Sequence, residues 1–288
     1  MSKILKVALI QFSPISYDRK ANLKKSLNLA KNALEDGAKI VLFPELFDSG
    51  YCIEDRDKEF GLDFSKNEIF SKLLELAKTY KAYMIACSIE KVKSKLYDTA
   101  YVIGKKGILG KYRKIYLWGD EIKRFKSGNE YPVFKLNFDE FSVKVGLQIC
   151  YEIGFGEGAR FLALKGAEIL CYMAAFGKAR NYVWDLASKA RALENGQFIL
   201  ACNRSGSEIS KLSQEELLFA GNSRIINPKG EILGKITQKE GVLIREIDLE
   251  EVAIQRENLP YLKDIDLKLN NKILKKIIKE KKWLKKKF

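Results

Sequence analysis

The sequence predicts an α/β protein built as a four-layer αββα sandwich, in which two mixed sheets pack face to face and helices cover their outer faces. Three observations predict this fold. Strand-like and helix-like hydrophobic periods alternate along the whole chain. Several strand-like runs are apolar on both faces, so both faces need cover. About a dozen strands accompany only four main helices before the C-terminal tail, too few helices for the alternative of one doubly wound sheet.

The first half of the chain alternates strands with two helices. Leu23, Leu27, Ala30 and Leu34 fall on one helical face, and Gly37 is a natural stop for that helix. The elements expected in this half are a strand at 4–12, a helix within 19–36, a strand at 38–43, a helix around 69–77, and strands at 83–92, 96–104 and 108–112.

The second half opens with a hairpin, in which strands at 133–138 and 141–150 flank a turn at Asp139 and Glu140. Two helix–strand pairs follow the hairpin, and three strands close the fold. These elements are a helix at 157–165, a strand at 168–173, a helix at 181–195, a strand at 198–203, and strands near 222–227, 231–236 and 241–248.

Length and composition favour one large domain with a short appendage. The 288 residues are 47% apolar, and no linker rich in Ser, Gly or Pro interrupts them. We expect one large domain at 1–265 and a basic tail at 266–288. The apolar run near the N-terminus lacks the length and cleavage site of a signal peptide, and no segment approaches the roughly 20 apolar residues of a membrane span.

Five dispersed cysteines without a CxxC pair fit a reducing compartment, so a cytoplasmic location is expected. Cys87, Cys171 and Cys202 lie inside apolar strand-like runs. For these three, a buried and inert thiol is the favoured interpretation.

The net charge of +15 is concentrated at the C-terminus. Residues 271–288 carry nine lysines and one glutamate, which gives +8 and leaves +7 for the other 270 residues. Apolar residues recur there at helical spacing, at Ile273, Leu274, Ile277, Ile278 and Leu284. One interpretation is a basic amphipathic helix for a membrane surface or nucleic acid. The favoured one is a solvated terminal helix whose apolar stripe packs on its own domain or on a sister subunit.

The candidate chemistry begins with Cys150, which closes a strand-like run where the chain turns toward a helix. The chain contains no histidine, which excludes Ser-His and Cys-His catalysis and an ordinary zinc site. The proton of a Cys150 nucleophile must therefore go to a carboxylate. Glu45 and Lys114 also follow strand-like runs, so a carboxylate and an ammonium could meet the thiol at one rim.

Three segments resemble the signature segments of the nitrilase superfamily of carbon–nitrogen hydrolases, in order and in spacing. They are Phe-Pro-Glu-Leu-Phe at 43–47, Tyr-Arg-Lys-Ile-Tyr-Leu at 112–117 and Gly-Leu-Gln-Ile-Cys-Tyr-Glu at 146–152. The similarity continues through 157–167, 191–195, 202–206 and 221–230, and so covers about residues 5–250. The resemblance implies a Glu–Lys–Cys triad at Glu45, Lys114 and Cys150, with no metal and no organic cofactor.

The resemblance also implies a second glutamate after the lysine, which positions the substrate amide and assists the leaving amine. Glu121, followed by Phe125 and Gly128, fits that pattern. Asp120 and Glu130 are less well placed.

Residues of the substrate pocket are less clearly indicated. The candidate aromatic residues are Tyr116, Trp118, Tyr151, Phe176 and Trp184. A place in the core or at a dimer interface is the alternative for them. Asn203 and Arg204 offer contacts to a polar or carboxylate substrate, and the alternative is a strand-end hydrogen bond and a surface charge. In many relatives histidine stands at the position of Tyr116 and aspartate at that of Glu152.

The expected function is thiol-dependent hydrolysis of a small-molecule amide through a Cys150 thioester, releasing ammonia or an amine. Hydrolysis of an N-carbamoyl amine or amino acid, which also releases CO2, is the alternative. A remoter alternative is a binding protein whose enzyme-like core has lost its activity and whose basic tail binds a membrane or nucleic acid. The expected partners are a small-molecule substrate and a second copy of the chain. In the helix at 181–195, Val183, Trp184 and Ala187 offer an apolar patch that the family pairs across a two-fold axis.

Overall fold

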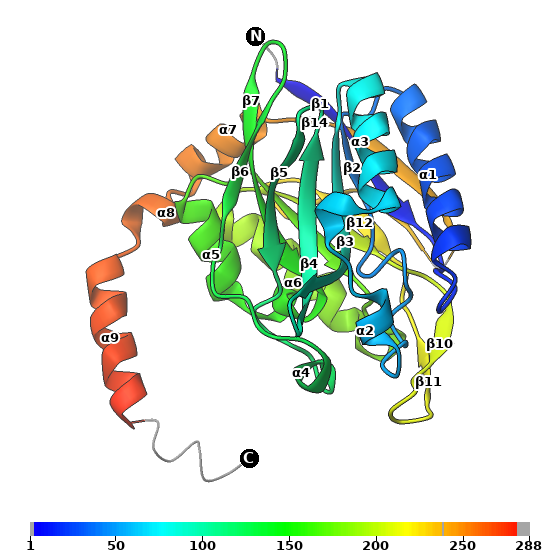
Figure 1. Cartoon of the computed structure of the whole chain (residues 1–288). Helices are drawn as coiled ribbons and strands as arrows, with labels where there is room; N and C mark the ends of the chain where they lie inside the picture. The colour runs from blue at the N-terminus through cyan, green and yellow to red at the C-terminus, as the bar shows by residue number, and fades with distance from the viewer. Residues whose placement is uncertain (1–2, 238, 281–288) are drawn as a thin grey trace.

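Two six-stranded mixed sheets pack face to face in the computed structural model, which describes residues 3–237 and 239–280 (Figure 1). The strand order is β14-β1-β2-β3-β4-β5 in the first sheet and β13-β12-β9-β8-β7-β6 in the second. Helices lie on the outer faces of both sheets (Figure 1). The predicted αββα sandwich is therefore confirmed.

The first sheet contains parallel and antiparallel pairs. β1, β2 and β3 are parallel neighbours, while β14, β4 and β5 pair antiparallel. Its strands are β1 (Ile4–Gln11), β2 (Ile40–Leu42), β3 (Tyr83–Val92), β4 (Lys95–Gly104), β5 (Gly107–Arg113) and β14 (Gly241–Asp248).

The second sheet repeats this pattern, with β7, β8 and β9 parallel and the flanking strands antiparallel. Its strands are β6 (Val133–Asn137), β7 (Ser142–Ile149), β8 (Ile169–Ala174), β9 (Phe198–Asn203), β12 (Ser223–Ile226) and β13 (Ile232–Ile236). The hairpin expected at 133–150 is β6 and β7. A separate two-stranded ribbon, which the sequence did not predict, is formed by β10 (Ser207–Ile209) and β11 (Glu216–Leu218).

Four main helices cover the sheets, as expected. α1 (Arg19–Glu35) and α3 (Glu68–Tyr80) pack on the first sheet, and α5 (Gly156–Leu164) and α6 (Asn181–Asn195) on the second. The Asp18 side chain caps α1 by accepting from the Ala21 N–H at 2.9 Å. Additional helices, most of them short, are α2 (Asp57–Phe60), α4 (Glu121–Arg124), α7 (Glu250–Asn258), α8 (Tyr261–Asp264) and the 3-10 turns Phe64–Lys66, Cys150–Gly154 and Lys178–Arg180.

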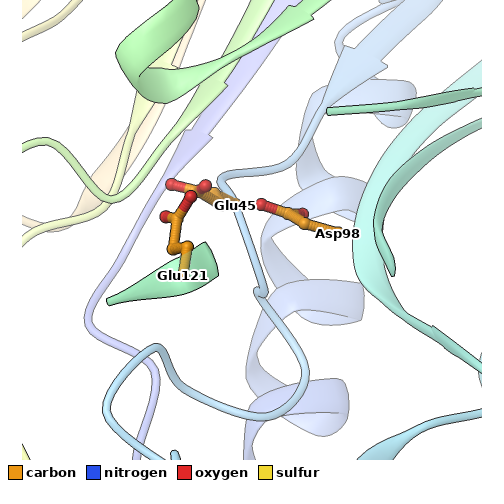
Figure 2. A group of neighbouring side chains, drawn as sticks. All are labelled: Glu45, Asp98 and Glu121. Atoms are coloured by element: carbon orange, nitrogen blue, oxygen red, sulfur yellow. The ribbon is translucent and has the colours of Figure 1, made fainter. Parts of the chain in front are cut away.

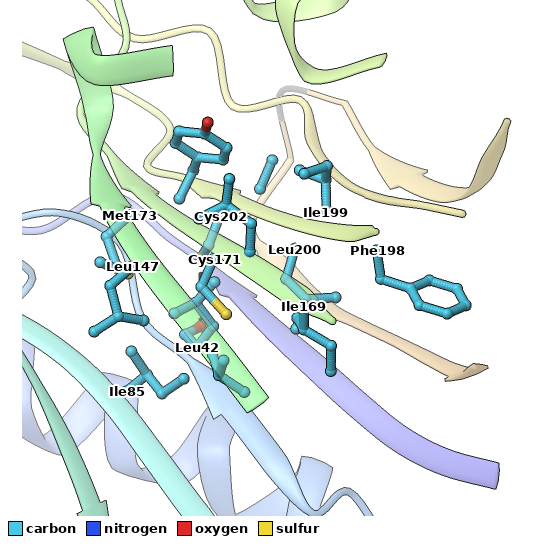
Figure 3. Packing of buried hydrophobic residues seen from close by; sticks show 14 of the residues in the cluster. Leu42, Ile85, Leu147, Ile169, Cys171, Met173, Phe198, Ile199, Leu200 and Cys202 are labelled. Carbon is cyan, nitrogen blue, oxygen red and sulfur yellow. Dashed lines mark hydrogen bonds between the residues drawn. The ribbon is translucent and has the colours of Figure 1, made fainter. Parts of the chain in front are cut away.

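The main core lies between the sheets. Leu42 and Ile85 of the first sheet face Leu147, Ile169 and Cys171 of the second (Figure 3). The cysteines predicted to be buried, Cys87, Cys171 and Cys202, are fully inaccessible to solvent. This continuous apolar layer holds the two sheets in a fixed relation, which in turn fixes the side chains at their edges.

The apolar patch expected on the surface of α6 is wrong, because Val183 and Ala187 are partly buried and pack against the main core. Trp184 is fully buried and donates from Nε1 to the Asn222 carbonyl oxygen at 3.0 Å. It packs against Phe176 with ring centroids 5.3 Å apart, so it belongs to the core rather than to the helix surface. The exposed apolar side chains of α6 are instead Tyr182 at 66%, Leu186 at 68% and Leu193 at 42%.

The basic tail forms α9 (Leu267–Glu280), which stands away from the sandwich in Figure 1. Its predicted stripe of Ile273, Leu274, Ile277 and Ile278 is exposed, so within the described residues it does not pack on its own domain. Leu284 lies outside the described residues. No described helix has the length and apolar character needed to cross a membrane.

Candidate active site

Glu45, Lys114 and Cys150 come together because their strands end at one edge of the sandwich. Glu45 follows β2, and Lys114 follows β5, which is antiparallel to β4 and so points the same way as β2 and β3. Cys150 follows β7 of the other sheet. The carboxyl ends of parallel strands are where α/β proteins place their ligands.

Cys150 begins a single 3-10 turn and has a φ of 51°, in the left-handed region. Such a backbone is strained for a residue with a side chain, and it turns the thiol out of the β7 line toward the cavity described below. The thiol contacts the Glu45 carboxylate. Burial and then the negative charge of Glu45 raise the pKa of the Cys150 thiol well above its ordinary value, against the opposing effect of Lys114. The resting thiol therefore keeps its proton.

Glu45 is fully buried, and both of its carboxylate oxygens accept hydrogen bonds. Oε1 accepts from Lys114 Nζ at 2.7 Å, and Oε2 accepts from the Ala175 N–H at 2.6 Å. Burial alone would raise the pKa of Glu45, but the Lys114 ammonium and the hydrogen bonds hold it below its ordinary value. Glu45 is thus an ionised acceptor beside a protonated thiol.

Lys114 is fully buried between two glutamates. Its Nζ lies 2.7 Å from Glu45 Oε1 and 2.8 Å from Glu121 Oε1. Burial opposes the charged form, but the negative charges of Glu121 and Glu45 outweigh it and raise the pKa of Lys114 well above its usual value. The ammonium is a fixed positive charge at the centre of the site.

Glu121, the second glutamate implied by the family resemblance, lies at the start of α4 and belongs to the same cluster. Its Oε1 accepts from Lys114 and also from the Tyr51 hydroxyl at 2.6 Å, and its Oε2 accepts from the Trp118 N–H at 2.8 Å. Sequence reasoning did not find Tyr51, which lies in the loop after β2 where no periodic pattern singles it out.

Asp98 of β4 is a further buried carboxyl that sequence reasoning missed. Glu45, Asp98 and Glu121 are turned toward one another (Figure 2). One oxygen of each lies within 4.8 Å of one oxygen of each of the others. Its Oδ1 accepts from the Cys87 thiol at 3.0 Å, and its Oδ2 lies 3.6 Å from Lys114 Nζ. Three such carboxyls could hold a cation, but the Lys114 ammonium already supplies a positive charge among them.

A cavity of about 620 Å³ opens beside Cys150. Of the aromatic residues proposed from the sequence, Trp118, Tyr151 and Phe176 line it. Much of the remaining wall comes from two segments that the sequence did not single out, the 177–180 turn and residues 215–219 around β11. These segments are short and carry no hydrophobic period, so no sequence signal marked them.

Three other proposed pocket residues lie outside the cavity lining. Tyr116 is half-exposed and stacks on Phe155 at a centroid distance of 3.9 Å. Trp184 lies in the core. Asn203 is buried, and its amide binds backbone groups of Phe176 and Gly221. It therefore anchors the strand-end loops, which is the alternative that the sequence left open.

Arg204 is not the surface charge that the sequence offered as its alternative role. It is fully buried and pairs with Glu208, at a distance of 2.5 Å between Nη1 and Oε1. The other oxygen of Glu208 accepts from the N–H groups of Tyr51 and Cys52 at 2.9 and 2.7 Å. The pair thus fixes the loop that carries Tyr51 toward the cluster.

Comparison with known families agrees with this geometry. The sequence model of the carbon–nitrogen hydrolase family matches residues 6–257. This range includes the proposed catalytic residues Glu45, Lys114, Glu121 and Cys150. The chain belongs to the carbon–nitrogen hydrolase family. It is therefore a member of the nitrilase superfamily and an enzyme that hydrolyses carbon–nitrogen bonds.

Named relatives of this carbon–nitrogen hydrolase include nitrilases and amidases. The chain is 37% identical to a nitrilase of Pyrococcus abyssi, an alignment that covers 88% of this chain and 94% of that protein. It is 32% identical to an omega-amidase of Xenopus tropicalis, with 88% and 92% covered.

A solved structure offers a direct likeness of fold. It is a mutant of the amidase from Nesterenkonia sp. AN1, which shows covalent addition of the acetamide moiety of fluoroacetamide at the active site cysteine. The two chains are 25% identical and superpose with a TM-score of 0.79, with 93% of this chain and 96% of that chain covered.

The cluster contains the parts that attack on a carbonyl carbon requires. The thiol is a nucleophile, and the carboxylate in contact with it can take its proton. The ammonium, held at a fixed place in a buried cluster, can stabilise negative charge on oxygen.

Proposed function

We propose that this carbon–nitrogen hydrolase is a thiol-dependent amidase that acts on small molecules. The observation that carries the proposal is the buried cluster beside the cavity, in which the Lys114 ammonium binds the carboxylates of Glu45 and Glu121 next to the Cys150 thiol. This arrangement keeps the thiol unreactive until a carbonyl carbon is in place, and it offers only a carboxylate to receive the proton.

In the acylation step, Cys150 Sγ attacks the amide carbon while Glu45 takes the thiol proton. Negative charge then develops on the carbonyl oxygen, which Lys114 and backbone N–H groups after Cys150 stabilise. When the carbon–nitrogen bond breaks, Glu45 returns the proton to the leaving nitrogen. Ammonia or an amine departs, and the acyl group remains on sulfur as a thioester.

In the deacylation step, the oxygen of a water molecule attacks the thioester carbon while Glu45 takes a proton from that water. The carbon–sulfur bond breaks, the thiol regains its proton, and the carboxylic acid leaves. Glu121 keeps Lys114 in place through both steps by accepting a hydrogen bond from its ammonium. The chemistry uses side chains of this chain at every step.

The cavity indicates the size and polarity of the substrate. Its volume of about 620 Å³ is typical of a small-molecule site. Aromatic and aliphatic side chains such as Trp118, Phe176 and Val183 dominate its wall. A compact amide with an apolar portion therefore fits better than a peptide segment of a folded protein.

A substrate panel tests this proposal. Small amides, N-carbamoyl amines and nitriles are incubated with the enzyme, and ammonia and CO2 are measured in parallel. We expect ammonia without CO2, with amides turned over fastest. Equal amounts of ammonia and CO2 would replace the amidase by an N-carbamoyl hydrolase. No turnover of any compound would contradict an enzymatic role and favour a binding protein with a basic tail.

A further inference from the structure

The buried cluster has more carboxyl groups than positive charge. Glu45, Asp98 and Glu121 surround the single ammonium of Lys114, at 2.7, 3.6 and 2.8 Å from Nζ. If all three were ionised, three negative charges and one positive charge would leave −2. All four side chains are essentially inaccessible to solvent. An uncompensated charge of that size in a buried site is strongly unfavourable, so one carboxyl is expected to hold a proton.

The other titratable groups that face Asp98 do not supply the missing charge. Cys87 of β3 and Cys150 of the 3-10 turn are thiols, and burial raises the pKa of each, so both are neutral at neutral pH. The Tyr51 hydroxyl donates to Glu121 and stays neutral for the same reason. Among residues 3–237 and 239–280, Lys114 is the cation of this cluster.

Hydrogen bonding identifies which carboxyl carries the proton. Both oxygens of Glu45 and both oxygens of Glu121 accept from N–H or O–H donors. Asp98 differs, because its Oδ1 accepts only from the Cys87 thiol and no donor among the described residues reaches its Oδ2. The Asp98 and Glu45 carboxyl groups are nevertheless in hydrogen-bond contact. Two carboxyl oxygens in contact need a proton between them.

We propose that Asp98 is a neutral carboxylic acid that donates a hydrogen bond to the Glu45 carboxylate and thereby positions Glu45 toward Cys150. A carboxylate has about four acceptor sites. Lys114 Nζ, the Ala175 N–H and the Asp98 hydroxyl take three of those on Glu45, and the fourth faces the thiol. In agreement with this, burial and then the charge of Glu45 raise the pKa of Asp98 well above its usual range.

Asp98 is thus a positioning residue, and it keeps its proton throughout the reaction. The role of Glu45 as base rests on the proposed function. The protonation of Asp98 does not, because it follows from the charges and contacts of the resting protein.

Protein stability as a function of pH tests the protonation independently of activity. An aspartate in the unfolded chain has a pKa near 3.9, so above about pH 5 only the folded wild type binds this proton. Wild type should therefore lose folding stability relative to Asp98→Asn by about tenfold in the folding equilibrium constant per pH unit between pH 5 and 7. Asp98→Asn stays neutral and keeps a donor. Asp139→Asn, in the exposed β6–β7 turn, is the control and should show no such slope.

Kinetics of two variants test the positioning. Asp98→Asn retains an N–H donor toward Glu45 and should keep kcat within about threefold of wild type. Asp98→Ala removes the donor and should lower kcat by about 10- to 100-fold. A stability difference between wild type and Asp98→Asn that does not change with pH would overturn the protonation. Asp98→Asn as impaired as Asp98→Ala would overturn the positioning. An active Glu45→Gln enzyme would sink the proposed function and leave the stability result standing.

Discussion

The Tyr51 hydroxyl donates a hydrogen bond of 2.6 Å to Glu121 Oε1, the oxygen that also accepts from Lys114. Burial and the charge of Glu121 raise the pKa of Tyr51 well above its usual value, so the hydroxyl remains a donor at neutral pH. Tyr51 also lines the cavity. Through Glu121, Tyr51 therefore connects the wall of the cavity to the buried ammonium of Lys114.

Replacing Tyr51 by Phe should lower kcat roughly tenfold, since a hydrogen bond to a charged group is lost while the ring is kept. Without the Tyr51 hydroxyl, the Glu121 carboxylate would be free to move, and the Lys114 ammonium bound to it would move too. Steady-state kinetics measure the effect. Tyr83→Phe is the matched control, because the Tyr83 hydroxyl binds the Asn137 backbone away from the site. Unchanged kinetics of Tyr51→Phe would mean that Glu121 holds its position without the hydrogen bond from Tyr51.

Glu45→Gln should reduce turnover by at least ~10², because the amide has the shape of the carboxylate but cannot act as a base. Glu121→Gln should also impair turnover and leave the fold intact. Both are compared with Glu240→Gln, a change outside the site, using circular dichroism to verify folding. Wild-type kinetics of the Glu121 variant would remove that residue from the mechanism.

Much of this site could be predicted because strand ends are visible in a sequence. Glu45, Lys114 and Cys150 each follow an apolar strand-like run, and strands of a mixed sheet bring such ends to one edge. Glu121 was found only through the family resemblance. The two packed sheets with helices outside them followed from the same hydrophobic periods, whereas the order of strands within each sheet came only from the structure.

The misses have physical causes. Asp98 lies inside a strand, where an acidic residue normally faces solvent, and only the packing of the two sheets shows that it faces Lys114. For Asn203 the sequence left open a substrate contact and a strand-end hydrogen bond, and its amide binds the backbone of two loops whose positions the sequence does not give. Trp184 was assigned to the surface of α6 together with two apolar neighbours within about one helical turn. The sequence does not show which side of that helix packs on the sheet.

Glu152 should produce a pH dependence of stability. Its carboxyl accepts from the Tyr112 hydroxyl and from the N–H groups of Ile115 and Ile149, and burial, which these bonds oppose, raises its pKa to about 7. The unfolded value is near 4.3, so the folded state binds the proton more tightly. Its contribution to stability is therefore full below about pH 4.3 and is lost as pH rises to about 7.

The free energy of unfolding of wild type relative to Glu152→Gln should fall with pH from 5 to about 7 and then stay level. Chemical denaturation at one-unit intervals from about pH 5 to 8 measures this difference. Glu140→Gln, in the exposed β6–β7 turn, should show no trend. A difference for Glu152→Gln that is constant over the whole range would show that its carboxyl is already ionised at pH 5.

The exposed apolar side chains of α6 lead to a prediction of dimerisation. Tyr182 and Leu186 lie one turn apart and are about two-thirds exposed, and an isologous contact would bury both. Light scattering should give a mass near twice 32.9 kDa at micromolar concentration. Leu186→Glu should shift the protein to monomer, whereas Leu109→Glu, on the edge strand β5, should not. A monomeric wild type would contradict the prediction.

The most direct test of the account is the identity of the residue that acts as the nucleophile. Intact-mass and peptide-mapping spectrometry after exposure to an electrophilic amide such as fluoroacetamide should show a single adduct, on Cys150. The buried Cys52, Cys87, Cys171 and Cys202 should stay unmodified, and Cys150→Ala should show neither adduct nor turnover. An adduct on another cysteine, or continued turnover by Cys150→Ala, would contradict the account.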